Sequence, residues 1–194
     1  GRLLRRYRQG QAAVPAFLED YAFFCWGLIE LYQAGFDSRH LALALELTAD
    51  MERLFGDGRG ILYDSADDAE KVLTRGRTVI DGAVPAGNSA AALNLLRLAA
   101  LTGDLDMDER ARAIIGKTLP SAANYPTGTS LFNSALDQAL GPQQVVVIAG
   151  DREDPGAAAL LAVLRERFLP GTLVLRTTGD DSRLADLTPL VHGK

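Results

Sequence analysis

The stretch "DGAVPAGNSAAALNLLRLAALTGD", residues 81–104, decides the fold class of this chain. Its second half carries apolar residues at helical spacing, and Gly103 just past it is a common helix stop. Asn88 and Ser89 are good N-caps, so the sequence predicts a helix over residues 89–101. The polar lead-in is longer than a cap requires, which marks it as a candidate ligand loop.

Four more helices are predicted around it from apolar periodicity. Pro15 suits the first turn of the earliest one, which is apolar on most sides and so is predicted to be buried. Trp26 and Cys25, the single cysteine, lie inside that helix and are expected in the core, with stacking on a sugar face as the alternative for Trp26. The predicted ranges are 15–34, 38–55, 107–118 and 129–140.

The helical part contains a faint internal repeat. "GLIELYQAGFD" at residues 27–37 aligns with "NLLRLAALTGD" at residues 94–104, an offset of 67 residues. Each copy reads as a buried helix, a glycine-containing turn and a more amphipathic helix. This pattern predicts stacked αα-hairpins with apolar inner helices and more polar outer helices.

Short apolar runs predict the remaining elements. The first eleven residues favour a strand, and residues 61–63 and 78–80 favour a β-hairpin within an otherwise irregular segment. Near the other end, "VVVIAG" and "GTLVLRTT" read as buried parallel strands joined by a helix that Asp154 caps, which is a βαβ unit. A last short helix is expected within residues 180–191. We therefore predict a helical domain over 1–142 and a small α/β extension over 143–194.

Composition excludes several classes of function. The net charge of −5 argues against non-specific nucleic-acid binding, and no apolar run is long enough to span a bilayer. His40 and His192 are the only histidines, so we expect no metal site and no cofactor. One cysteine allows no internal disulfide, and a cytoplasmic setting is the default expectation. The start at Gly1 without a methionine suggests a piece of a longer protein.

Four motifs together resemble a known family. "PAFLEDYAF" (15–23), "YDSADDAE" (63–70), the stretch 81–104 and "VVVIAGDREDPGAAALLAVLRERFLP" (145–170) resemble the later part of the DUF255 thioredoxin domain-containing proteins, which include the YyaL-type and spermatogenesis-associated protein 20-like members. The resemblance implies an (α/α)6 toroid of the six-hairpin glycosidase type, of which this chain would be the last part. It also implies an N-terminal thioredoxin-like domain as a partner.

Toroids of this type are similar to sugar epimerases and glycoside hydrolases, which bind sugars in a central funnel. Glycoside cleavage needs two carboxyl groups, so Asp81 and Asp20, expected on the same rim, are the candidate catalytic residues. Asn88, Tyr21 and Tyr63 are the candidate ligand contacts. Each also has a structural interpretation: a turn for Asp81, helix-dipole pairing for Asp20, and capping for Asn88.

Two function classes remain open. The first is a carbohydrate-active toroid acting on a sugar or glycoside. The shortage of histidines argues against epimerase activity in particular. The second is a non-catalytic helical scaffold that serves the thioredoxin-like domain. Because a partial toroid exposes inner-helix faces, self-association is expected.

Overall fold

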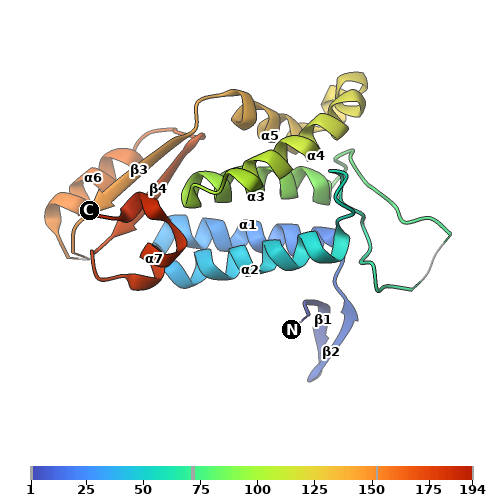
Figure 1. Ribbon diagram of the computed structural model, residues 1–194, viewed down its shortest axis with the longest axis horizontal. Coiled ribbons are helices and arrows are strands. Elements are labelled where there is room, and N and C mark those ends of the chain that lie inside the picture. The colour runs from blue at the N-terminus through green and yellow to red at the C-terminus, as the bar shows by residue number, and fades with distance from the viewer. Residues whose placement is uncertain (1, 71–72, 152, 194) are drawn as a thin grey trace.

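The computed structural model describes residues 2–70, 73–151 and 153–193, and it is mainly helical with two small sheets (Figure 1). A β-hairpin comes first, five α-helices follow, and a βαβ unit with a short last helix ends the chain. The elements are β1 (Leu4–Arg8), β2 (Gln11–Pro15), α1 (Leu18–Gly35), α2 (Ser38–Phe55), α3 (Gly87–Thr102), α4 (Leu105–Asn124), α5 (Ser130–Leu140), β3 (Gln144–Ala149), α6 (Pro155–Arg165), β4 (Thr172–Thr177) and α7 (Ser182–Leu187), with 3-10 turns at Pro126–Gly128 and Pro189–Val191.

The predicted repeat is confirmed by the two helix–helix connections, which have the same backbone conformation. The α1–α2 connection passes through Phe36 and the α3–α4 connection through Gly103, and both residues are left-handed, with φ of 56° and 77°. The next residue in each case, Asp37 or Asp104, then caps the second helix with its side chain. Phe36 and Gly103 are 67 residues apart, as the alignment predicts.

The helices divide into an inner and an outer set. α1 packs on α2 and α3 packs on α4, while α3 also packs between α1 and α5. Because neighbours surround it, α3 is buried along nearly its whole length. α2 and α4 carry buried residues on one face only, which is the pattern of outer helices.

The N-terminal segment differs from its prediction. The expected strand is the first half of a hairpin, and Pro15 belongs to β2 instead of opening a helix. α1 begins at Leu18, where the carboxylate of Asp20 accepts a hydrogen bond of 2.8 Å from the N–H of Phe17. A side chain in the first turn therefore fixes the start of this helix.

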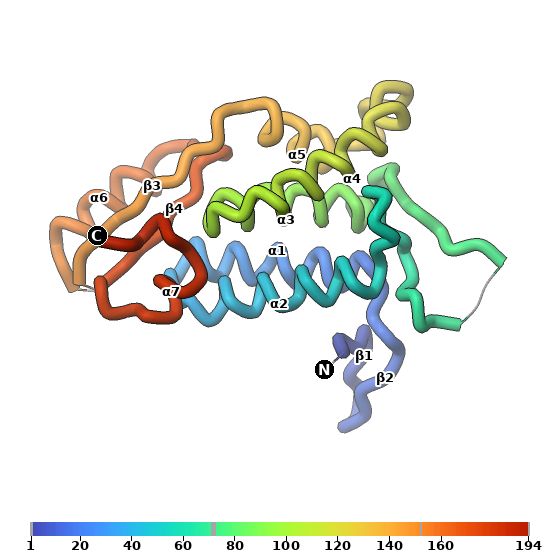
Figure 2. Tube along the Cα trace, viewed as in Figure 1, coloured from blue at the N-terminus to red at the C-terminus, as the bar shows by residue number. Residues whose placement is uncertain are grey.

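The predicted hairpin of residues 61–63 and 78–80 is wrong for the part of 57–86 that the structure describes, which contains no strand. Figure 2 shows that this segment extends beyond the C-terminal end of α2 and the N-terminal end of α3. In place of a ladder it makes isolated backbone hydrogen bonds and bonds to side chains: Tyr63 N–H donates to the carbonyl of Phe55, and Asp64 accepts from both the N–H and the hydroxyl of Thr78.

The start of α3 also differs. The helix begins at Gly87 with Ala86 as N-cap, so capping by Asn88 or Ser89 is wrong. A Cβ at Gly87 would lie 2.9 Å from Leu18 Cγ, so glycine is needed where α3 approaches α1. The N-terminal ends of both inner helices therefore meet at one end of the molecule.

The predicted βαβ unit is confirmed. β3 and β4 pair in parallel from Gln144↔Thr172 to Ala149↔Thr177, with α6 between them in the chain. Gln33 of α1 binds the outer edge of β4: its side chain donates to the carbonyl of Val174 and accepts from the same residue's N–H, at 3.0 and 2.9 Å. Residues of β4 lie in one core cluster with residues of α1 and α3.

Candidate functional site

Asp81 joins three segments of backbone. Its Oδ1 accepts from the N–H of Ala86 at 2.8 Å, and its Oδ2 accepts from the N–H groups of Leu131 and Phe132 at 2.8 and 3.4 Å. Leu131 and Phe132 are in the first turn of α5, so Asp81 supplies that helix with a remote cap and a favourable negative charge. Both oxygens are engaged in structure.

Asp20 and Tyr21 stand at the start of α1. Asp20 accepts from Phe17 N–H and lies 3.7 Å from the guanidinium of Arg5. The side chain of Tyr21 is fully buried, with its ring edge-on to Phe55 and its hydroxyl accepting from the N–H of Leu3. The expected sugar contact by Tyr21 does not fit this place, because its ring presents no exposed face.

Asn88 is fully buried, and its amide holds the long loop to α3. The oxygen accepts from Leu62 N–H at 2.8 Å, while the nitrogen donates to the carbonyls of Leu62 and Thr78 at 3.0 and 3.1 Å. This polar group therefore replaces the strand pairing that the loop lacks. A ligand contact by this amide does not fit its full burial and its three hydrogen bonds to the protein's own backbone.

The ring of Tyr63 contacts two cations. The guanidinium groups of Arg75 and Arg77 lie 4.0 and 3.9 Å from its ring centroid, which are cation–π distances. Arg77 also pairs with Asp57. The ring therefore already stacks with two side chains of its own loop, which does not favour stacking on a sugar.

A small cavity of about 260 Å³ lies at this end of the molecule, lined by Arg5, Phe17, Glu19 and Asp64 among others. None of the five predicted site residues lines it. These side chains take part in the contacts that position the loops and the starts of α1, α3 and α5, and they do not converge on the cavity.

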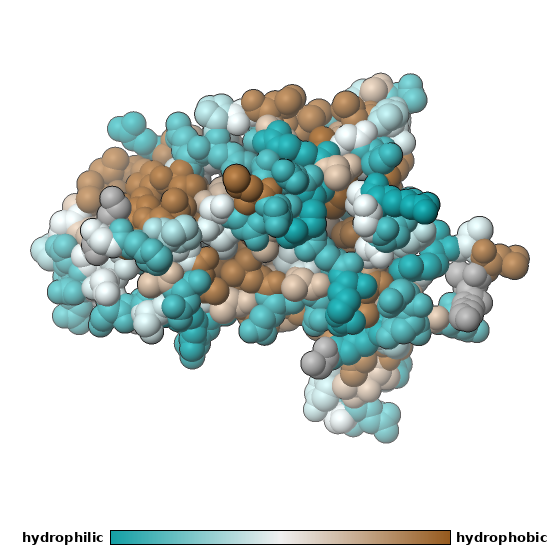
Figure 3. Space-filling model, viewed as in Figure 1, coloured by the Kyte–Doolittle hydropathy of each residue, from teal (hydrophilic) through white to brown (hydrophobic). Residues whose placement is uncertain are grey.

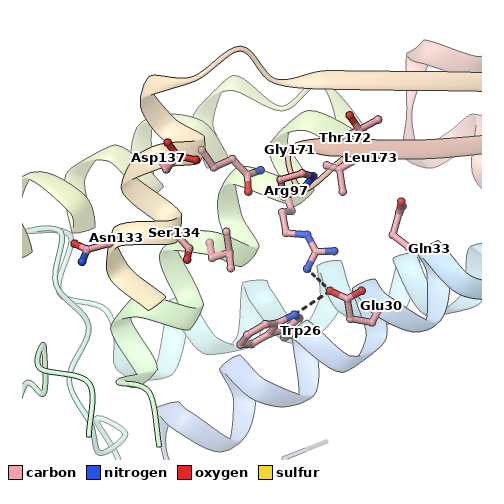
Figure 4. A pocket seen from close by; sticks show the side chains of 13 residues that line it. Trp26, Glu30, Gln33, Arg97, Asn133, Ser134, Asp137, Gly171, Thr172 and Leu173 are labelled. Carbon is pink, nitrogen blue, oxygen red and sulfur yellow. Dashed lines mark hydrogen bonds and ion pairs between the residues drawn. The ribbon is translucent and has the colours of Figure 1, made fainter. Parts of the chain in front are cut away.

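A groove of about 680 Å³ lies instead along the flank of the inner helices, between α1, α3, α5 and the residues that lead into β4 (Figure 4). α1 supplies Trp26, Glu30 and Gln33, and α3 supplies Leu93 and Arg97. The far wall comes from Asn133, Ser134, Asp137 and Gln138 of α5 and from residues 170–173.

Three side chains on one side of the groove form a fixed polar unit. Figure 4 shows Arg97 reaching from α3 toward Glu30 of α1, with Trp26 beside them. The guanidinium lies 2.7 Å from Glu30 Oε1, and the indole N–H of Trp26 donates to the same oxygen at 2.9 Å. The Arg97 side chain is only 12% exposed, whereas that of Glu30 is 55% exposed, so the guanidinium is largely buried and the carboxylate faces solvent at the groove.

The repeat explains this arrangement. Arg97 follows Glu30 by 67 residues, so the two are equivalent positions on adjacent inner helices, and their opposite charges meet across the α1–α3 contact. The expectation of Trp26 in the core is wrong, since it is half-buried and lines the groove. The aligned repeat itself was the signal that could have identified the pair, because it places both residues at one level.

The chemistry available in the groove is recognition of a polar molecule. An aromatic ring offers a flat apolar face, the guanidinium donates, carboxylates accept, and the amide and hydroxyl side chains do both. The lining residues include no histidine or cysteine. Glu30 Oε1 is already engaged, because it pairs with Arg97 and accepts from the indole N–H of Trp26.

The single cysteine is set apart from this chemistry. Cys25 is fully buried beside Thr48, with Sγ 3.3 Å from its hydroxyl, and burial raises the pKa of the thiol from 9.0 to about 11. The folded state then favours the neutral thiol, and this stabilisation is present below pH 9 and is lost as the pH rises through about 11.

We therefore expect Cys25 to resist a thiol reagent at about pH 8 in the native protein and to react rapidly in denaturant, because only the thiolate is nucleophilic. Absorbance of the released chromophore from a disulfide reagent measures both rates. Native Cys25 reacting as fast as the denatured thiol would contradict this prediction.

Within the described ranges, no helix is both long and apolar enough to cross a membrane.

Comparison with known proteins relates the chain to longer proteins. No family model matches it. Spermatogenesis-associated protein 20 of Homo sapiens and of Rattus norvegicus are each 32% identical over 168 residues, which is 86% of this chain and 21% of those proteins. An uncharacterized protein of Caenorhabditis elegans is 26% identical over 173 residues, 89% of this chain and 24% of that protein.

The chain thus spans about a fifth to a quarter of the length of these relatives. The predicted likeness to spermatogenesis-associated protein 20 is confirmed, whereas membership of the DUF255 family and the toroid stay predictions.

Proposed function

We propose that the groove between α1, α3 and α5 binds a sugar or a similarly polyhydroxylated small molecule. The observation that carries this proposal is the half-buried Trp26 beside the Glu30–Arg97 pair on the groove wall. An indole face suits the C–H face of a sugar ring, and fixed charged groups suit its hydroxyls. A volume of about 680 Å³ matches that of small-molecule sites.

The proposal places binding away from the residues that the sequence favours. Asp81 and Asp20 serve helix starts, so the polar contacts to a sugar come from Arg97, Asp137 and Gln138. Turnover of a glycoside would need a second carboxylate opposite Glu30, and Asp137 on the α5 wall is the one that the groove offers.

The sole tryptophan of the chain makes the test specific, because intrinsic indole fluorescence reports on the groove alone. Titration with a panel of monosaccharides and disaccharides should change the Trp26 emission with saturation. Asp137→Asn should weaken the responding sugar by roughly 10- to 100-fold, as loss of a charged hydrogen bond of about 1.5–3 kcal/mol implies. Product analysis of the same mixtures distinguishes binding from hydrolysis.

Glu109→Gln is the matched control, since Glu109 is an exposed carboxylate on α4 outside the groove. It should leave the titration unchanged. No fluorescence response and no thermal shift with any sugar would refute the proposal, and an equal effect of both variants would refute the assignment of Asp137.

One observation favours the second candidate function, a helical scaffold for a partner such as the predicted thioredoxin-like domain. Phe24 and Leu31 are 45% and 52% exposed on α1, whereas the equivalent positions on α3, Ala91 and Leu98, are fully buried in clusters that include α1. The exposed face of α1 therefore suits another helix of the same kind. If no sugar changes the Trp26 fluorescence or the thermal stability, the scaffold function is favoured.

A further inference from the structure

Helix α6 has an apolar outer face. Its sequence "PGAAALLAVL", residues 155–164, contains no polar side chain. Ala157 and Leu161 are buried against the small sheet, as the inner side of the helix requires. Leu160 and Val163, in contrast, are 61% and 49% exposed.

This composition is unusual for a surface helix, which normally alternates an apolar face with a charged one. Figure 3 shows apolar residues gathered at the end of the molecule where α6 and β3 lie. Contiguous apolar surface on a soluble domain usually marks a site of association. The small residues Ala158, Ala159 and Ala162 are exposed too, so another helix can approach closely.

The two ends of α6 carry opposite charge. Asp151, Glu153 and Asp154 precede the helix, together with Arg152, which lies outside the described residues. After the helix come Arg165, Glu166 and Arg167. Carboxylates therefore predominate at the N-terminal end and guanidinium groups at the C-terminal end.

We propose that two copies of this chain associate through α6, with the two helices antiparallel about a twofold axis. A twofold contact brings the same patch of both copies together, so the patch must complement itself. The antiparallel arrangement does this, because the acidic end of one helix meets the basic end of the other and the helix dipoles oppose. With the axis near Leu160, Glu153 of one copy lies toward Arg167 of the other.

The charges around α6 argue against a membrane surface as the alternative partner of its apolar face. A membrane-surface helix carries lysine and arginine along its polar face, and α6 has neither along 155–164, with a carboxylate-rich segment before it. The chain as a whole has a net charge of −5, which repels anionic lipid.

Sedimentation equilibrium of the full chain over a wide range of protein concentration tests the proposal. We expect a monomer–dimer equilibrium. Ala159→Glu on the outer face of α6 should weaken the dimer at least about tenfold, because it introduces an unpaired charge at the axis. Ala49→Glu, an exposed alanine on the outer helix α2, is the matched control and should leave the equilibrium unchanged. Circular dichroism confirms that both variants are folded.

Charge exchange tests the antiparallel arrangement itself. Glu153→Arg and Arg167→Glu should each weaken the dimer at low salt, and the double variant should restore it. High salt should reduce these differences, since the pairs are exposed.

Several outcomes would overturn the proposal. They are a wild-type monomer at every concentration, a dimer that Ala159→Glu leaves intact but Leu31→Glu on α1 dissociates, or binding to anionic vesicles in place of dimerisation. Failure of the charge exchange alone would refute the antiparallel arrangement. None of these outcomes bears on sugar binding in the groove, which lies between other helices.

Discussion

Asn88→Ala is expected to lower the free energy of unfolding by about 4 kcal/mol, a large part of the stability of a typical domain. The substitution removes three hydrogen bonds of a fully buried amide. It leaves the N–H of Leu62 and the carbonyls of Leu62 and Thr78 without that partner, and an unpaired buried polar group is destabilising. Urea unfolding followed by Trp26 fluorescence and by circular dichroism measures the change.

Asn124→Ala is the matched control, because Asn124 is an exposed asparagine at the end of α4. We expect it to change stability by less than about 0.5 kcal/mol. An Asn88 variant as stable as this control would mean that the long loop does not depend on the amide, and would reopen a ligand-binding role for Asn88.

Asp81→Ala is expected to destabilise the protein by about 3 kcal/mol, since its carboxylate accepts from Ala86, Leu131 and Phe132 and lies at the N-terminal end of α5. Asp81→Asn keeps one acceptor oxygen and should lose about half as much. Hydrogen exchange should show the amides of Leu131 and Phe132 losing protection in both variants.

Asp67→Ala serves as the control for Asp81, because Asp67 is an exposed carboxylate of the same long segment. It should leave stability and amide exchange nearly unchanged. A catalytic Asp81 would behave in the opposite way, with Asp81→Asn abolishing turnover at unchanged stability, and that result would refute the structural role.

The helical part was predictable because its signals are local and repeated. Apolar periodicity located α2 correctly from Ser38 to Phe55, and the 67-residue offset matched Asp37 to Asp104 as caps. The start of α1 was missed because it depends on Asp20 binding back to Phe17, three residues earlier, where Pro15 offered an equally plausible start. Residues 61–63 have strand-like side chains, but their partners are the side chain of Asn88 and the backbone of α2, which no periodicity reveals.

The candidate site was less predictable, for a physical reason. A carboxylate that caps a distant helix and a carboxylate that awaits a substrate have the same sequence surroundings, and only the 50-residue contact from Asp81 to α5 separates them. The groove is built from α1, α3 and α5 together, so Trp26 is on its wall only once these helices are packed. Seen within α1 alone, Trp26 belongs to an apolar run and is indistinguishable from core.

Gln33 has a consequence for how this molecule avoids aggregation. The exposed edge of a β-sheet is a template on which strands of other chains can grow into fibrils. At Val174 the carboxamide of Gln33 already occupies the N–H and the carbonyl that an incoming strand would need, as a peptide group of a third strand would. A single side chain, reaching across 141 residues of sequence, thus closes the middle of the β4 edge to polymerisation.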